Sequence, residues 1–453
     1  ILLDNPSGDE ASLVEEALTV LAPLEGNRFV VADPALESAR LTALGMAYKR
    51  RALGDPEDNM ELAIALWRRA LVIRFKGVDE AVSAGTRYNL ANALLRRPAG
   101  DRRENFAEAL ALHKRVQRVR ATGDAPAQLQ GRSWLAIGNV QYERARLDSP
   151  PDAKRLRAAI AAYRKSREHL DAEKLPGDAA MAATLEGQAQ ALLAPDPDSV
   201  DAALACYADA EKAATLAGDI LQREDILARC GSLQFQLQRW PAAAQAYAGA
   251  ARDRRRLMAQ AISGATRERR LAAMAPYAAR LAYALIKCGK LDAAIDALHA
   301  ARTIDLQAAW RGVRADDPAS SSYRRLRAQV IELEDAEREA SADGGPAADA
   351  SLHKIHEALV PARLELEAAA DALTSDDAAA DRVGGYACLL ETLPDGVLLA
   401  LPVVTHAGTA LVFATRHEAK AYPNNIFYLD DFTAGAVNAM LGIEPVRDDG
   451  GCQ

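Results

Sequence analysis

The sequence is poor in aromatic residues and in cysteines, and each scarcity excludes a class of protein. The five cysteines among 453 residues are scattered, odd in number and without CxxC spacing. This excludes a disulfide-stapled secreted scaffold and predicts free thiols in a reducing, cytoplasmic compartment. Aromatic residues make up only 5% of the chain although hydrophobic residues make up 50%, because alanine supplies much of the apolar share. Such a composition favours helices, since alanine loses no side-chain entropy on entering one.

Long apolar runs and the common nucleotide and hydrolase motifs are also absent. The longest apolar run, 397–404, is interrupted by Pro402 and is too short to cross a bilayer, and no signal peptide is visible. No GxxxxGK[ST], GxGxxG or GxSxG motif occurs, so we expect no phosphate loop and no cofactor. The net charge of −8 argues against a general nucleic-acid binder. Because the chain begins at Ile1 inside a helical pattern, we expect it to be part of a longer protein.

A helix–turn–helix pattern is clearest in the stretch 224–253. Gly231 in its first helix and Ala243 and Ala250 in its second are small residues at the positions where the two helices would touch. Tyr247, one turn after Ala243, is placed to fill the groove between them. These offsets are those of a tetratricopeptide (TPR) repeat, a unit of about 34 residues.

The same pattern recurs along the chain. An alanine in each second helix is followed four residues later by a bulky residue and usually by a small residue three positions after that. These alanines are Ala63, Ala109, Ala159, Ala203, Ala243 and Ala294, spaced 40 to 51 residues apart. Generic antiparallel helices with alanine at their contacts are the alternative, but six matches in register favour a repeat array. We therefore predict a mainly α protein with a TPR superhelix over residues 1–314, an α-solenoid with a concave groove.

The residue after the small packing residue of each first helix is expected to face that groove. Most of these residues are uncharged hydrogen-bonding side chains, which can pair with the backbone of a bound peptide. The predicted partner-binding residues are Asn92, Asn139, Gln188, Ser232 and Tyr283, together with Asn89, which lies one turn before Asn92. Met46 holds the same position in the first repeat. The predicted partner is a protein or a peptide, and the alternative is that these groups only face solvent.

An arginine-rich helix is predicted over 251–276. Its basic residues are Arg252, Arg254, Arg255, Arg256, Arg267, Arg269 and Arg270. A basic face of this kind can bind RNA, in which case affinity would fall steeply with salt. A solvated face paired with nearby carboxylates is the favoured interpretation, so nucleic acid is expected as an indirect partner at most.

The pattern changes after the repeats. Apolar residues at three- and four-residue spacing on both sides of a turn at 341–346 predict a long helical hairpin over 318–375. Two β-type runs, 396–404 and 409–414, follow and are joined by the turn-like stretch 405–408. A third strand is predicted at 425–429, and a second domain over 384–453.

The order of TPR array, helical hairpin, Leu-Pro-Asp-Gly, strand, turn and strand resembles that of TPR–CHAT proteins. The residues that carry this resemblance are LETLPDG at 390–396, PVVT at 402–405 and GTALV at 408–412, with AIDALHAAR at 294–302 as the last repeat before the hairpin. The resemblance implies that 384–453 is the first part of a caspase-like α/β domain. It further implies a histidine–cysteine peptidase gated by a partner on the repeats, often in bacterial defence within a larger complex.

No catalytic residue is assigned by this resemblance. The Ala-Cys-His-Gly-like and Ser-Ala-Cys-like segments that carry the dyad in that family do not occur in the 453 residues. Cys388 and His406 share the β-type region, but Cys388 falls before the first strand and His406 lies in the hairpin turn, which disfavours them as a catalytic pair. His353 and His356 have no evident third ligand and are interpreted as surface histidines, so we expect no metal. A non-catalytic TPR interaction module is the alternative function.

Overall fold

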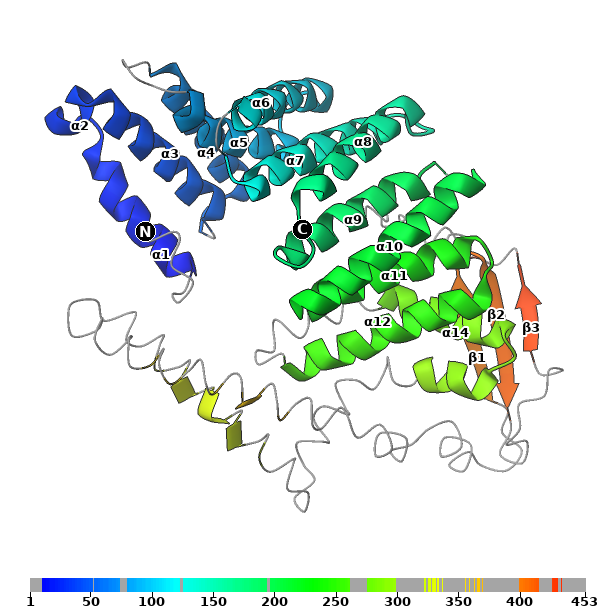
Figure 1. Ribbon diagram of the computed structural model, residues 1–453. Coiled ribbons are helices and arrows are strands. Elements are labelled where there is room, and N and C mark those ends of the chain that lie inside the picture. The colour runs from blue at the N-terminus through cyan, green and yellow to red at the C-terminus, as the bar shows by residue number, and fades with distance from the viewer. Residues whose placement is uncertain are drawn as a thin grey trace. The chain divides into compact units, whose positions relative to one another are not determined.

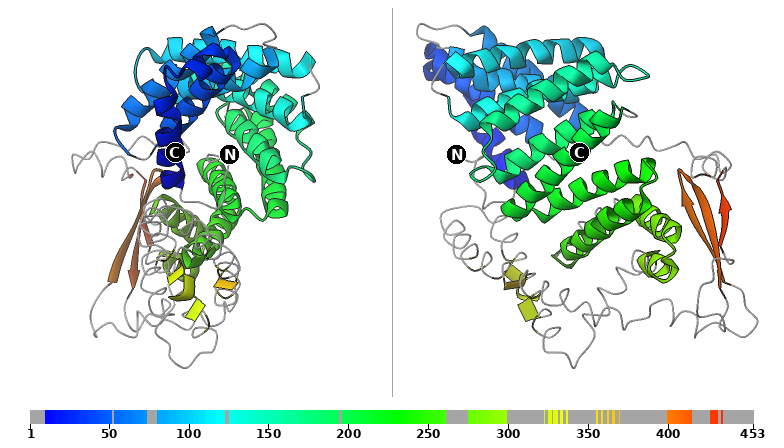
Figure 2. Two further views of the ribbon diagram at one scale, coloured as in Figure 1. Left: turned by 90° about the vertical axis from the view of Figure 1, so that its left-hand side faces the viewer. Right: turned by 45° about the vertical axis from the view of Figure 1, so that its right-hand side comes forward.

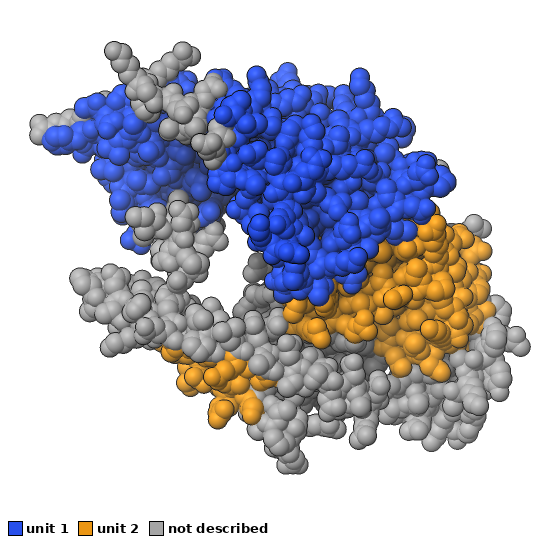
Figure 3. Space-filling model, in the orientation of Figure 1, with its two compact units in different colours: residues 1–219 blue, residues 220–453 orange. Residues whose placement is uncertain are grey.

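The computed structural model describes most of the repeat region and part of the rest of the chain (Figure 1). The described residues are 10–51, 53–73, 80–122, 125–193, 196–260, 275–298, 322, 325, 326, 328–330, 332, 333, 336, 355, 358, 362, 365, 366, 369, 399–414, 426–430 and 433. The chain divides into two compact units, residues 1–219 and 220–453 (Figure 3).

The first unit consists of helices that pack as successive antiparallel pairs. In chain order these are α1 (Glu10–Leu21), the 3-10 helix η2 (Ala22–Leu24), α2 (Arg28–Ala32), α3 (Pro34–Arg50), α4 (Pro56–Val72), α5 (Glu80–Arg96), α6 (Arg102–Thr122), α7 (Ala127–Ala145), α8 (Ala153–His169), α9 (Pro176–Ala191) and α10 (Pro197–Ala217). From α3 onward each helix packs on the next, so that α3/α4, α5/α6, α7/α8 and α9/α10 form four stacked hairpins. The unit is therefore a TPR-like α-solenoid, as the repeat pattern predicts.

Aspartates begin several of these helices. Asp33, Asp55, Asp152 and Asp196 accept hydrogen bonds from the first free backbone amides of α3, α4, α8 and α10. Proline follows directly at the start of α3, α4 and α10, where its missing N–H has no helical partner to lose. Helix α3 accordingly begins at Pro34, directly after its Asp33 cap.

Aromatic side chains of the second helices fill the space beside glycines of the first helices. A Cβ added at Gly45 would lie 2.6 Å from Nε1 of Trp67, and one added at Gly187 would lie 2.9 Å from Cε1 of Tyr207. The other glycine–aromatic pairs of this kind are Gly138 with Tyr163 and Gly231 with Tyr247. The prediction that a bulky residue fills the groove between paired helices is confirmed.

The second unit begins with the pair α11 (Ile220–Gln236) and α12 (Trp240–Gln260), followed by α14 (Ala275–Lys287). The chain reverses at Gln238, which has a positive φ of 55°, and helix α12 begins at Trp240, so the helix–turn–helix predicted for 224–253 is confirmed. Residues 291–298 are helical again, and Leu291, Ala294 and Ile295 pack in the same core as α14.

A three-stranded antiparallel sheet packs beside α14 in this unit (Figure 2). Strands β1 (Leu399–Thr405) and β2 (Gly408–Ala414) form a hairpin in which Thr405 pairs with Gly408, and β3 (Ile426–Leu429) pairs with β2. Val403 and Val412 are 1% exposed in the same cluster as Phe235 of α11 and Tyr283 of α14. The predicted hairpin and third strand are confirmed, whereas a caspase-like α/β domain is not shown.

The region of the predicted helical hairpin contributes a small cluster of its own. Leu326 and Val330 are buried together with Ala362 and Leu366, and the described residues around them are helical. The boundaries predicted at 314, 318–375 and 384 stay predictions.

Candidate functional site

The first helices of unit 1 contact one another through polar side chains. Oγ1 of Thr42 in α3 lies 2.9 Å from Oγ1 of Thr86 in α5. Further along, Arg132 of α7 donates from Nη2 to Oδ2 of Asp178 in α9 at 3.0 Å. We call the surface formed by α3, α5, α7 and α9 the first-helix face. These contacts fix α3 against α5 and α7 against α9, as a preformed binding surface requires.

Four of the predicted partner-binding residues belong to this face. Asn89, Asn92, Asn139 and Gln188 are all half-buried, on α5, α7 and α9. Nδ2 of Asn89 lies 3.1 Å from Sδ of Met46, which joins α5 to α3. Asn92 has no hydrogen bond to any other described residue. These four residues are partly accessible to water, and their role in partner binding stays a prediction.

Asn139 is held in place by the aromatic residue that fills the hairpin behind it. The hydroxyl of Tyr163 donates to Oδ1 of Asn139 at 3.0 Å. Burial raises the pKa of the Tyr163 phenol well above its usual value, so the group stays protonated and keeps donating. Because Oδ1 of Asn139 accepts this hydrogen bond, the bond also fixes the orientation of the side-chain amide nitrogen of Asn139.

The two predicted binding residues in unit 2 differ from each other. Ser232 is half-buried on α11. Tyr283 is 1% exposed, and its ring centroid lies 5.7 Å from that of Phe235 and 5.7 Å from that of Trp240. Tyr283 therefore belongs to the core between α14 and the sheet and does not offer its ring to a partner. The position of Tyr283 in the repeat pattern predicted a surface residue, because a repeat pattern does not reveal that a sheet covers this helix.

The structure describes three of the five cysteines and one of the candidate histidines, His406. Cys206, Cys230 and Cys288 are free thiols, and burial, followed by the nearby charge of Glu186, raises the pKa of Cys206 to about 12. A thiol with that pKa stays protonated at neutral pH and is a poor nucleophile. His406 is exposed in the β1–β2 turn with its ring 5.1 Å from that of Phe235.

The remaining candidates lie outside the described residues. Cys388, His353 and His356 lie outside them. No cluster of three or more His, Cys, Asp or Glu side chains that could hold a metal occurs among the residues described. Within that same part of the chain, no helix is long and apolar enough to cross a membrane.

The arginine-rich helix is partly committed to ion pairs. Arg254 is 8% exposed and donates from Nη2 to both carboxylate oxygens of Glu224 at 2.8 Å. Its neighbour Asp253 is 2% exposed and pairs with Arg223. Arg252 and Arg256 are exposed, and the side chain of Arg255 and residues 267–270 lie outside the description. The favoured interpretation, pairing with carboxylates, holds for Arg254.

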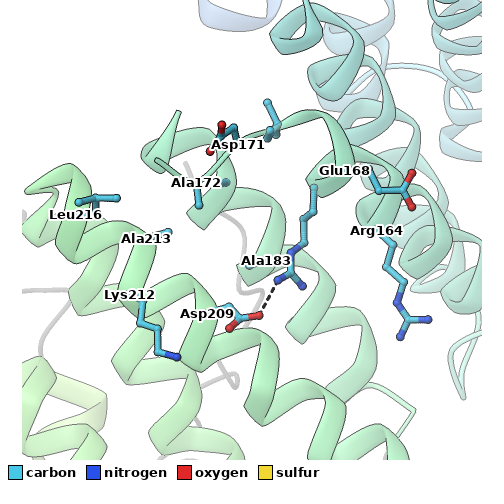
Figure 4. Close-up of a pocket in the computed structure, with 12 residues that line it drawn as sticks. Arg164, Glu168, Asp171, Ala172, Ala183, Asp209, Lys212, Ala213 and Leu216 are labelled. Carbon is cyan, nitrogen blue, oxygen red and sulfur yellow. Dashed lines mark hydrogen bonds and ion pairs between the residues drawn. The ribbon is translucent and has the colours of Figure 1, made fainter. Parts of the chain in front are cut away.

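A trough opens between the second helices α8 and α10 of unit 1 (Figure 4). Its volume is about 770 Å³, and its floor is formed by Ala179 and Ala183 of α9. The trough exists because α8 and α10 both pack on α9, whose small alanine side chains leave the space between the two outer helices open. A volume of this size lies within the range of about 300–1,000 Å³ that is typical of ligand sites.

A network of ion pairs joins the walls of the trough. Glu186 of α9 is 3% exposed and accepts from Nε of Arg164 at 2.8 Å and from Nη1 of Arg167 at 2.9 Å. Arg167 also donates from Nη2 to Oδ2 of Asp209 in α10 at 2.7 Å. Burial opposes the charge on Arg167, but its hydrogen bonds to the two carboxylates outweigh that effect and raise its pKa. Arg167 thus ties together three consecutive helices.

Sequence reasoning missed this trough, although one signal pointed to it. Glu186 precedes Gly187, the packing glycine of an alanine-rich helix, so a charged side chain is forced towards the interior and needs a cation. Arg164 and Arg167 lie three residues apart on the preceding helix and share one face. Their pairing with Glu186 was therefore foreseeable, but the open space beside them was not.

The comparisons with known proteins show a likeness in structure. No family model matches it, and no curated protein matches it. Among solved structures, it is similar to a Rap protein complexed with Competence and Sporulation Factor, with 13% sequence identity and a TM-score of 0.38. That match covers 78% of this chain and 85% of the other. Similarity at this level carries no argument about function.

Proposed function

We propose that this chain is a protein-interaction scaffold whose first-helix face receives a protein or peptide partner. The observation that carries the proposal is the row of half-buried amides on that face, Asn89, Asn92, Asn139 and Gln188. Amide side chains offer both a donor and an acceptor, so they can pair with the backbone of a bound segment whatever its side chains. The hydrogen bonds and ion pairs between neighbouring first helices hold this surface in shape before a partner arrives.

Co-purification from the source organism tests the proposal. We expect the wild-type chain to retain a partner that the double variant Asn92→Ala, Gln188→Ala loses. Arg157→Ala is the matched control, because Arg157 is an exposed residue of the second helix α8. A partner that the double variant and the control retain equally would show that the first-helix face does not bind it.

The resemblance to TPR–CHAT proteins supports a finer proposal. In it, the scaffold senses a partner and regulates a caspase-like cysteine peptidase in bacterial defence. The packing of the sheet against α14 supplies one physical link that such regulation needs, because β1 and β2 share a core with the helices of unit 2. Coupling also requires two states with different partner affinity, which is the property to be measured.

Intact mass and peptide mapping of the native polypeptide test the finer proposal. Peptides that carry CHAT-type histidine and cysteine motifs would support it, and replacing that cysteine by alanine should then abolish proteolysis. A native mass near 48.5 kDa would refute it and leave the scaffold function standing.

A further inference from the structure

Two cations and an amide lie at one end of the first-helix face, towards the ends of α3 and α5. Lys49 lies one turn after Met46 on α3, and Arg96 lies one turn after Asn92 on α5. Lys49 and Arg96 are exposed, and neither has an ion pair with another described residue. The side chain of Asn92 likewise has no hydrogen bond within that part of the chain. We call Lys49, Asn92 and Arg96 the basic end of the first-helix face.

Two contacts show how α3 and α5 are aligned. Oγ1 of Thr42 lies 2.9 Å from Oγ1 of Thr86. About one turn later on both helices, Sδ of Met46 lies 3.1 Å from Nδ2 of Asn89. Because the contacts advance in the same direction along both helices, α3 and α5 run parallel and in step.

The same alignment brings the members of the basic end together. One further turn along both helices places Lys49 level with Asn92, and Arg96 follows one turn beyond. Partial burial, and then the positive charges of Arg96 and Arg50, lower the pKa of Lys49 below its usual value. The charges of Lys49 and Arg96 are therefore close enough to repel each other, and an anion held between them would relieve that repulsion.

Neighbouring arginines of the same two helix ends have carboxylate partners. Nε of Arg51 donates to Oε1 of Glu15 at 2.7 Å, and Nε of Arg97 donates to Oε1 of Glu61 at 2.6 Å. The helix dipole favours cations in a last turn, which accounts for basic residues at both helix ends. It does not account for two cations placed side by side, because like charges destabilise each other.

We propose that the basic end binds the carboxylate of an acidic side chain of the protein or peptide that occupies the first-helix face. This inference rests on the proposed function and names the partner's side chain that the face selects. A carboxylate accepts hydrogen bonds at both oxygens, so Nζ of Lys49, the guanidinium of Arg96 and the amide nitrogen of Asn92 can donate to one group. The amides along the face tolerate many partner sequences, whereas this charge contact fixes which residue of the partner lies at this end.

Parallel selections from a displayed library of random peptides test the proposal. One selection uses the full wild-type chain, and the other uses the full chain with Lys49→Glu and Arg96→Glu. We expect the wild type to enrich peptides with a recurring Asp or Glu, whose affinity falls about tenfold or more in the charge-reversed variant. Changing that acidic residue to lysine should weaken binding to the wild type and restore binding to the charge-reversed variant. Restored binding also shows that the variant is folded.

Two further double variants separate the contact from general effects of charge. Lys154→Glu with Arg157→Glu makes the same charge change at exposed residues of the second helix α8 and should bind like the wild type. Lys49→Gln with Arg96→Gln removes both cations without placing a negative charge at a helix end, and it should also lose affinity.

The possible outcomes distinguish this inference from the function on which it rests. Peptides that lose affinity in Gln188→Ala but not in the charge-reversed variant would refute the basic end and leave the first-helix face standing. Selection without enrichment, or peptides unaffected by either change, would refute both. Equal losses in the α8 control would reduce the effect to net charge. Inorganic phosphate that binds as tightly as the acidic peptides would identify a simple anion site and refute the inference.

Discussion

The ring of Tyr163 occupies the space that any side chain at position 138 would need. Tyr163 is fully buried on α8, and a Cβ built on Gly138 of α7 would overlap its ring. The same relationship between Gly45 and Trp67 brings α3 and α4 together. These contacts allow two helix backbones to approach closely around one large ring, and they determine the spacing of each hairpin.

Replacing Gly138 by alanine should therefore destabilise unit 1. The added methyl group forces the Tyr163 ring or helix α7 to move, and overpacking of this kind costs about 1–3 kcal/mol. Hydrogen exchange of the α7 and α8 amides measures the effect locally.

Gly85 provides the matched control for this substitution. It lies in helix α5, and a Cβ added there meets no atom within 4 Å. Gly85→Ala should stabilise the protein by about 0.5–1 kcal/mol, because alanine is the better helix former. Equal exchange rates in the Gly138→Ala and Gly85→Ala proteins would contradict the packing argument.

These glycine–aromatic pairs explain why the sequence predicts the hairpins so well. Gly231, Ala243, Tyr247 and Ala250 lie within one local stretch, so their offsets contain the geometry of the pair. Tyr283 shows where this reasoning ends. Its offset is that of a surface residue, but strand β3 brings Tyr428 to 6.4 Å from its ring. The sequence distance between these two residues is too long for any periodic pattern to reveal the contact.

Glu186 and Asp209 should differ sharply in their contribution to stability. Glu186 is 3% exposed and its side chain neutralises two arginines. The Asp209 side chain is 51% exposed and, within the described part of the chain, pairs with Arg167 alone. Glu186→Ala removes the buried carboxylate and leaves Arg167 partly buried without it, at a cost of about 2–4 kcal/mol. Asp209→Ala should cost less than about 1 kcal/mol. Urea unfolding of the two variants compares them directly, and equal midpoints would show that the Glu186 network is not stabilising.

The pair of Glu224 and Arg254 in unit 2 offers a double-mutant test. Both side chains are almost fully buried, and removing one of them takes from the other its close, doubly hydrogen-bonded counter-charge. Each single variant, Glu224→Leu or Arg254→Met, should lose about 3–5 kcal/mol. The double variant should be more stable than either single one, because no uncompensated charge remains. Losses that simply add would mean that the two residues do not act as a pair.

The trough between α8 and α10 illustrates the part of the site that no sequence pattern contains. The individual charges of Arg164, Glu186 and Lys212 are visible in the sequence. Whether these charged residues border an open space depends on the separation of α8 and α10 on α9. That separation is determined by Ala179 and Ala183 together with the packing of both neighbouring hairpins. Cavities are thus a property of the packing of several elements, and local propensity does not specify them.

His113 occupies the position at which the other hairpins of unit 1 carry tryptophan or tyrosine. It is completely buried on α6, and neither ring nitrogen has a hydrogen-bond partner among the described residues. The ring of His113 lies edge-on to the ring of Tyr88 on α5, with centroids 5.3 Å apart. The guanidinium group of Arg120 lies over the ring of Tyr88. Burial and then the positive charge of Arg120 lower the pKa of His113 from 6.5 to about 4. The folded protein therefore holds this imidazole neutral.

This lowered pKa makes the stability of the wild-type protein depend on pH. Below the unfolded-state pKa of 6.5 the unfolded chain binds a proton at His113 that the folded chain rejects until about pH 4. The free energy of unfolding should therefore fall as the pH decreases through this window, by at most about 1.4 kcal/mol per pH unit, and the loss should level off below it. In His113→Phe this contribution disappears, because phenylalanine fills the same space without a titratable group. Urea unfolding of both proteins at about pH 7 and about pH 5 measures the difference, in which the carboxylates common to both cancel. A stability difference between the two proteins that is the same at both pH values would contradict the assignment of this pH dependence to His113.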